Sequence, residues 1–113
     1  MADKSLCPCA EECPVQKSLS SIGGKWKLPI ICSLAADGPS RYNELLKRVR
    51  GISNTMLSQT LKRLEQIGLI SRQVYPEVPP RVEYSLTARG QSLMPHVNAL
   101  IGWALEHFEE IAK

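Results

Sequence analysis

One segment specifies most of the fold: ISNTMLSQTLKRLEQIGLISRQVYPEVPPRVEYSLT, residues 52–87. Its first half carries leucines at helical spacing, which predicts a helix. Ser53 follows an apolar residue and can serve as the N-cap, and Gly68 can stop the helix after Ile67. We therefore expect a helix over residues 53–67 with one apolar face and one polar face.

The second half of this segment predicts a two-stranded ribbon over residues 69–87. The first strand spans residues 70–75, and the second, residues 81–86, alternates strictly between apolar and polar side chains, as in a half-buried strand. The connection between them contains three prolines, which fix the backbone and remove hydrogen-bond donors. We expect a stiff, protruding loop between two antiparallel strands.

Three further helices are predicted upstream of this segment. The first begins at Pro14 and ends before Gly23-Gly24, and the second covers residues 25–36. Ser40 can cap a third helix that runs to about Val49 and is followed by a short glycine-containing turn. Residues 40–67 therefore predict a helix-turn-helix.

The C-terminal region, residues 88–113, predicts a long helical segment that Thr87 can cap. Pro95 lies inside it, so we expect a kink or two successive helices. Its apolar stripe is wide for a chain of this length, and together with the first helix it indicates a dimer interface. The residues assigned to this interface are Val15, Leu19, Val97, Ile101, Leu105 and Phe108. The alternative is that the stripe packs only against its own core.

The bulk composition suits one folded domain. The chain has 113 residues, of which 43% are hydrophobic and 22% charged. Its apolar runs are shorter than the roughly 18 residues of a membrane span, and its start lacks the apolar centre of a signal peptide. These features predict a cytoplasmic protein without a membrane association.

Enzymatic function is not expected. His96 and His107 lack nearby carboxylate and thiol partners for a nucleophilic triad, and no glycine-rich loop could cradle a phosphate. We therefore predict neither a catalytic site nor a cofactor.

Positive charge is concentrated in the middle of the chain. The net charge is +3, but residues 40–90 alone hold nine cations and four anions, whereas residues 91–113 hold one cation and three anions. A phosphate-facing surface requires such a distribution, although a solvated basic face would also account for it. The excess favours an anionic partner such as double-stranded DNA.

The polar face of the helix over residues 53–67 carries side chains that can bond base edges or phosphates. The candidates for groove contacts are Asn54, Thr55, Ser58, Gln59, Lys62 and Arg63, and those for phosphate contacts are Lys47, Arg48, Arg50, Arg72 and Arg81. A helix in another scaffold could show the same face to water. The ribbon directly after the helix and the local positive charge favour DNA.

Three cysteines, Cys7, Cys9 and Cys13, precede the first helix, and Cys32 lies in the apolar second helix. Cys13 stands before Pro14 at an expected N-cap, where the helix dipole favours a reactive thiolate, although two neighbouring glutamates oppose this. Three interpretations stay open: a redox or electrophile switch centred on Cys13, inert thiols, and a zinc or iron-sulfur site. If the dimer brings the two N-terminal arms together, Cys13 of one subunit could form a disulfide with Cys7 or Cys9 of the other.

Several ordered blocks together resemble one family. They are Cys13-Pro14-Val15, Ile22-Gly23-Gly24-Lys25-Trp26, Arg41-Tyr42-Asn43-Glu44-Leu45, Gly51-Ile52-Ser53, Met56 to Leu61, and Tyr75 to Thr87. At this spacing the chain resembles the HxlR-type transcriptional regulators over roughly residues 13–105.

The resemblance implies an α+β, mainly α fold: a winged helix-turn-helix with a two-stranded wing and N- and C-terminal dimerisation helices. Residues 1–113 would form one domain, with an arm (1–12), a helix-turn-helix (40–67), a wing (69–87) and a dimerisation region (88–113). The helix over residues 53–67 would be the recognition helix.

The resemblance further implies a homodimer that binds a pseudo-palindromic operator, as an activator or a repressor. Some relatives sense electrophiles, quinones or oxidants through a cysteine in the position of Cys13, so a small molecule or an oxidant is the expected effector. The alternative function is a protein-interaction module without specific DNA binding.

Overall fold

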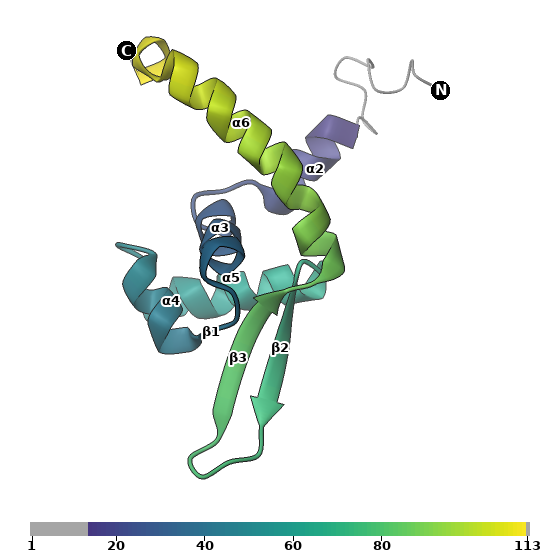
Figure 1. Ribbon diagram of the computed structural model, residues 1–113, viewed down its shortest axis with the longest axis vertical. Coiled ribbons are helices and arrows are strands. Elements are labelled where there is room, and N and C mark those ends of the chain that lie inside the picture. The colour runs from purple at the N-terminus through teal and green to yellow at the C-terminus, as the bar shows by residue number, and fades with distance from the viewer. Residues whose placement is uncertain (1–13, 113) are drawn as a thin grey trace.

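The computed structural model describes residues 14–112, and Figure 1 shows how their elements are arranged. The elements in chain order are α2 (Pro14–Ile22), α3 (Lys27–Asp37), β1 (Ser40–Arg41), α4 (Tyr42–Arg48), α5 (Asn54–Gln66), β2 (Ile70–Tyr75), β3 (Arg81–Leu86) and α6 (Ala88–Ala112). The β2–β3 hairpin extends from one end of the molecule, and α6 extends from the other. The helices α3, α4 and α5 lie between them.

The core lies where α3, α4 and α5 meet the base of the hairpin. Leu57, Leu61 and Leu64 of α5 are buried, so the predicted apolar face of this helix is confirmed. Their partners are Ile30, Ile31, Leu34, Leu45, Val49, Ile52, Leu69 and Ile70. The polar face of α5 is thereby directed outward.

Side-chain caps fix the two helices that flank the hairpin, as predicted. Ser53 Oγ accepts a hydrogen bond from the backbone N–H of Met56 at 3.1 Å, which satisfies one free donor at the start of α5. Thr87 Oγ1 accepts from the backbone N–H of Gly90 at 3.1 Å and donates to the carbonyl of Gly68. Thr87 therefore joins the end of α5 to the beginning of α6.

The sheet has three strands in the order β1-β3-β2, all antiparallel. The predicted ribbon is confirmed, with pairs from Ile70 opposite Leu86 to Tyr75 opposite Arg81. The short strand β1 was not predicted, and it pairs Arg41 with Glu83. A two-residue strand has no measurable periodicity, which explains why the sequence pattern did not indicate it.

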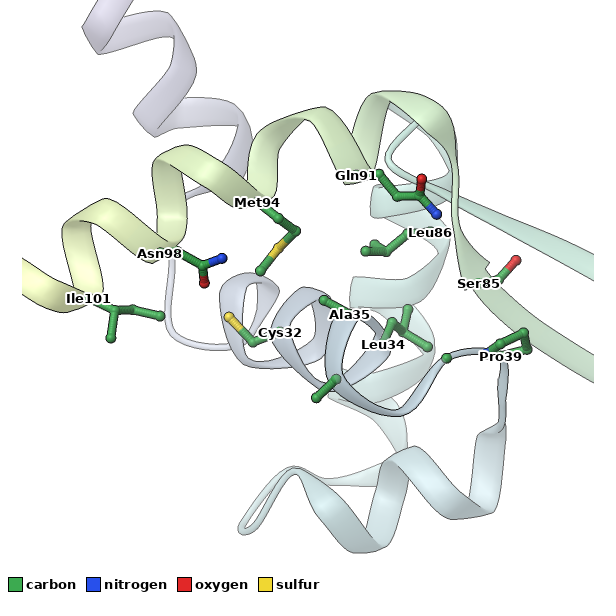
Figure 2. A pocket seen from close by; sticks show the side chains of 12 residues that line it. Cys32, Leu34, Ala35, Pro39, Ser85, Leu86, Gln91, Met94, Asn98 and Ile101 are labelled. Carbon is green, nitrogen blue, oxygen red and sulfur yellow. The ribbon is translucent and has the colours of Figure 1, made fainter.

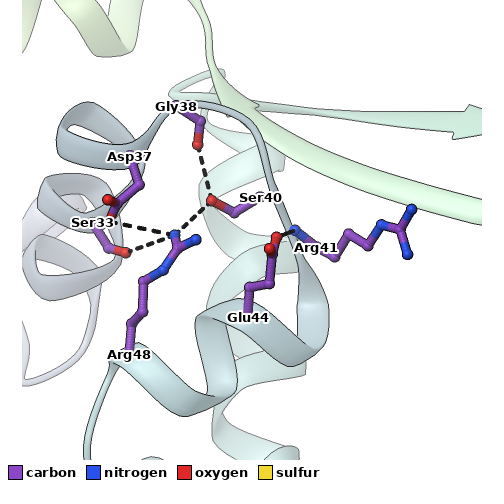
Figure 3. Close-up of polar contacts among 7 residues, drawn as sticks. All are labelled: Ser33, Asp37, Gly38, Ser40, Arg41, Glu44 and Arg48. Atoms are coloured by element: carbon purple, nitrogen blue, oxygen red, sulfur yellow. Dashed lines mark hydrogen bonds and ion pairs between the residues drawn. The ribbon is translucent and has the colours of Figure 1, made fainter.

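The prediction that Ser40 caps the third helix is wrong. Ser40 lies in β1, where its hydroxyl donates to the carbonyl of Gly38 at 2.9 Å and accepts from Arg48 Nη1 at 2.7 Å. The N-terminus of α4 is closed instead by Glu44, whose Oε1 accepts from the backbone N–H of Arg41 at 2.7 Å, as Figure 3 shows.

The C-terminal region forms one helix, so the alternative of two successive helices is wrong. Pro95 lies inside α6 at an exposed position, where the carbonyl left without an N–H partner can face water. Gly90 is buried where the beginning of α6 passes close to the backbone of Leu69, just before β2: a Cβ atom there would collide with the carbonyl oxygen of Leu69. Across residues 14–112, no helix combines the length and apolar character needed to cross a membrane.

Candidate nucleic-acid interface

The outward face of α5 brings the predicted groove residues together on one exposed surface. All six, Asn54, Thr55, Ser58, Gln59, Lys62 and Arg63, are exposed. Because the buried leucines fix the rotation of α5 about its own axis, these side chains stand away from the core. They offer amide, hydroxyl, ammonium and guanidinium donors, which can bond base edges and phosphates.

The base of the hairpin adjoins this surface. A hollow of about 330 Å³ lies between α5 and the hairpin, and its lining includes Ser58, Lys62, Arg72 and Tyr84. The structure therefore places two predicted groove residues beside one predicted phosphate contact. Glu65 also lines the hollow and adds a negative charge at its edge.

Arg48 has partners within the chain. Its Nη1 donates to Ser40 Oγ at 2.7 Å and lies 3.5 Å from Ser33 Oγ and 3.5 Å from a carboxylate oxygen of Asp37. Figure 3 shows the guanidinium directed into this group from α4. Arg48 thus joins α4 to α3 and β1, and part of its bonding capacity is already used.

Arg81 is also engaged by its own strand and loop. Its guanidinium lies 3.1 Å from Glu77 and 3.6 Å from Glu83, and it stacks over the ring of Tyr75 at 4.1 Å. These carboxylates offset its positive charge next to the hairpin tip, where Val78 is fully exposed. The hairpin tip is therefore less cationic than the sequence alone indicates.

Lys47, Arg50 and Arg72 are exposed, and none takes part in an ion pair among the described residues. Arg41, which we did not assign to the interface from sequence, is exposed too. Figure 3 shows its guanidinium extending away from Glu44, since only its backbone takes part in that cap. The sequence placed Arg41 inside a predicted helix, and that prediction did not indicate that its side chain points to solvent.

Tyr42 is a second residue that sequence reasoning missed. Its ring is partly buried and packs against the core. Its hydroxyl, however, reaches the first turns of α5 and contacts Asn54 and Ser58. The separation of 12 and 16 residues along the chain leaves no local pattern that could reveal these contacts.

The second half of α6 presents an apolar surface to solvent. Its large side chains there, Leu100, Ile101, Trp103, Leu105 and Phe108, are between 43% and 76% exposed. Val97 is only 7% exposed within the single chain and has little surface left for a partner. Val15 and Leu19 lie in α2, but their side chains are outside the described ones. Trp103 extends the apolar surface beyond the predicted residues.

The three N-terminal cysteines, Cys7, Cys9 and Cys13, lie outside the described residues. Cys32 lines a cavity of about 800 Å³ between α3, α6 and the end of β3, with Met94, Asn98 and other mostly apolar neighbours (Figure 2). Burial raises the pKa of the Cys32 thiol and so reduces its thiolate fraction. Within residues 14–112, no group of histidine, cysteine and acidic side chains could hold a metal ion.

Comparison with known proteins places the chain among transcriptional regulators. The model of the HxlR-like helix-turn-helix family matches residues 21–112. An HTH-type transcriptional regulator of Methanothermobacter thermautotrophicus is 50% identical over 91 residues, which cover 80% of this chain and 69% of the relative.

Solved structures of regulators share the fold. The redox regulator HypR in its reduced form has a TM-score of 0.82 at 38% identity, covering 88% of this chain and 97% of that chain. The reduced form of the regulator YodB from Bacillus subtilis has a TM-score of 0.74 at 39% identity, covering 81% and 90%. The arrangement of α3, α4, α5 and the hairpin and the matches together show that the chain belongs to the HxlR-like helix-turn-helix family of transcriptional regulators, and not to a family of enzymes.

Proposed function

We propose that the protein is a sequence-specific DNA-binding regulator that acts as a homodimer on a pseudo-palindromic operator. The observation that carries the proposal is the exposed polar face of α5 beside Arg72 of the hairpin. In this geometry α5 enters the major groove with its N-terminal residues at the base edges, and the hairpin lies along the flanking backbone. The two recognition helices of a dimer would lie one DNA turn apart, about 34–36 Å.

The phosphate contacts divide into two groups in this proposal. Lys47, Arg50 and Arg72 have no ion pair among the described residues and supply the main electrostatic attraction. Arg48 and Arg81 stay candidates, but their internal carboxylate partners would have to be displaced or shared. We expect Arg48 and Arg81 each to contribute less to the affinity for DNA than Lys47, Arg50 or Arg72.

Salt dependence tests this proposal. The logarithm of the binding constant of a selected operator duplex should fall linearly with the logarithm of salt concentration. Arg72→Gln should reduce the magnitude of that slope by about 0.9, the value for one lost phosphate contact. Arg81→Gln is the matched control and should reduce it less, because Glu77 and Glu83 already offset its charge.

A wild-type slope near zero would contradict DNA binding through these cations and would favour the protein-interaction alternative. Equal changes in the two variants would contradict only the division between Arg72 and Arg81. Fluorescence anisotropy of a labelled duplex at several salt concentrations measures both.

The homodimer is supported by the exposed apolar surface of α6, which extends away from the body (Figure 1). The Cα radius of gyration is 16.2 Å, whereas a compact domain of this length has about 13 Å. A second copy that packs against α6 would bury this surface. The proposed interface consists of Ile101, Leu105 and Phe108, with Leu100 and Trp103 at its edges, and of α2.

A redox response through Cys13 is the second part of the proposal. Cys13 directly precedes the first residue of α2. Among the structures similar to this chain, HypR is named a redox regulator, and YodB was also solved after treatment with diamide. Oxidation would join the Cys13 sulfur to that of Cys7 or Cys9 in the other subunit, with two electrons and two protons passing to the oxidant. Cys32 is less suited, because burial raises its pKa.

Diamide should therefore change the operator affinity of the wild type by about 5- to 150-fold, the usual range of coupling between two sites. Cys13→Ser should abolish the change, whereas Cys32→Ala should retain it. An unaltered oxidant response in Cys13→Ser would remove Cys13 from the mechanism without affecting the proposal of DNA binding.

A further inference from the structure

The hydroxyl of Tyr42 is surrounded by three oxygens of α5. Tyr42 Oη lies 2.9 Å from the main-chain oxygen of Asn54, 3.1 Å from Asn54 Oδ1 and 3.2 Å from Ser58 Oγ. Tyr42 is the first residue of α4, so these contacts join the beginning of α4 to the first turns of the recognition helix. Both Asn54 and Ser58 are exposed on the proposed DNA-binding face.

The number of protons on Tyr42, Asn54 and Ser58 decides which atom donates and which accepts in these hydrogen bonds. The tyrosine hydroxyl has one proton, and both oxygens of Asn54 can only accept, so that proton is directed to Asn54. Ser58 is the remaining neighbour, and it can complete the group only by donating its own proton to Tyr42 Oη. The Ser58 proton is therefore used within the protein, and Asn54 Oδ1 is turned toward the hydroxyl of Tyr42, which its main-chain oxygen also contacts.

The hydrogen-bonding groups that stay free on Asn54 and Ser58 differ: one side chain has a free donor and the other a free acceptor. The Asn54 carboxamide has its oxygen turned toward Tyr42, so its NH₂ group is the part left to face a ligand as a donor. Ser58, one turn later, has used its proton and offers lone pairs as an acceptor. The two positions thus present a donor followed by an acceptor.

We propose that Tyr42 is a specificity-determining positioning residue, which makes Asn54 a donor and Ser58 an acceptor toward the bases of the operator. The inference rests on the proposed function, in which α5 enters the major groove. Asn54 then selects a base that presents an acceptor there, which guanine, thymine and adenine do and cytosine does not. Because its oxygen is turned toward Tyr42, it is directed away from the amino group with which adenine would complete a two-point contact. Ser58 selects a base that presents an amino group, adenine or cytosine.

The test is selection of duplexes from randomised DNA by the full-length protein and its variants, followed by sequencing. Asn54→Ala and Ser58→Ala locate the base positions that each side chain reads, since only those preferences should disappear. At the Asn54 position the wild type should disfavour cytosine, the one base without an acceptor in the major groove.

Tyr42→Phe removes only the hydroxyl and keeps the ring in the core. It should raise the enrichment of adenine relative to guanine and thymine at the Asn54 position by about 3- to 10-fold, the value of one hydrogen bond, because the released carboxamide can turn its oxygen to the adenine amino group. The other positions and the salt dependence should be unchanged, which a merely structural defect would not produce. Tyr75→Phe, in the hairpin, is the matched control and should leave the whole profile unaltered.

Asn54→Asp tests the same polarity without changing Tyr42. Its free oxygen is an acceptor, so the preferred base at that position should change to adenine or cytosine. A wild-type preference for cytosine at the Asn54 position, or an unchanged profile in Tyr42→Phe, would overturn the inference while leaving the proposed function intact. If the wild type enriches no sequence at all, the proposed function fails and this inference fails with it.

Discussion

Leu105→Glu is expected to separate the protein into monomers and to weaken operator binding by about 10²- to 10⁴-fold, the usual gain from linking two binding events. Leu105 is 76% exposed and is the most exposed of the large apolar side chains described on α6. A carboxylate at this position would lose its hydration in the dimer without gaining a partner, which strongly disfavours association. Each monomer would keep its recognition helix but could contact only one half-site.

The matched control for this variant is Ala99→Glu. Ala99 is exposed on α6 but lies about 120° around the helix from Leu105. Ala99→Glu introduces the same charge into the same helix, so the dimer and its affinity for the operator should both persist. Sedimentation velocity and binding to a full operator and to a half-site measure the two effects. A Leu105→Glu protein that stays dimeric would place the subunit interface elsewhere.

Regular patterns made much of the fold predictable from sequence. The leucines of α5 repeat at helical spacing, and the strand at residues 81–86 alternates, so both elements could be predicted. Caps follow the same logic because Ser53 and Thr87 act on residues three positions away. These signals are local, and local signals can be read without knowing the tertiary structure.

The features that sequence did not reveal depend on contacts between distant residues. The strand β1 exists because β3 lies beside it, and its pairing takes Ser40 away from the helix start. The ion pair between Arg48 and Asp37 and the contacts of Tyr42 with α5 likewise require the packed structure. A count of cations therefore identifies the basic region, but it does not tell which cations are free.

Removing buried side-chain volume from the core face of α5 should have the largest effect on stability. Leu57 is fully buried in α5, and Leu57→Ala should lower the free energy of unfolding by about 2–5 kcal/mol through lost burial and the cavity left behind. Alanine has the highest helix propensity, so the loss cannot come from the helix itself.

Met56→Ala is the matched control, because Met56 is the preceding residue of α5 and is 38% exposed. Met56→Ala should lower the free energy of unfolding by less than about 1 kcal/mol, since much of the Met56 side chain is already hydrated. Urea unfolding at one fixed protein concentration measures both values, because dimer formation makes stability depend on concentration. Equal losses in the two variants would mean that α5 is rotated from the orientation described. The outward direction of Asn54, Ser58 and Lys62 would then fail as well, because the burial of Leu57 and the exposure of the proposed DNA-binding face are set by the same rotation of one helix.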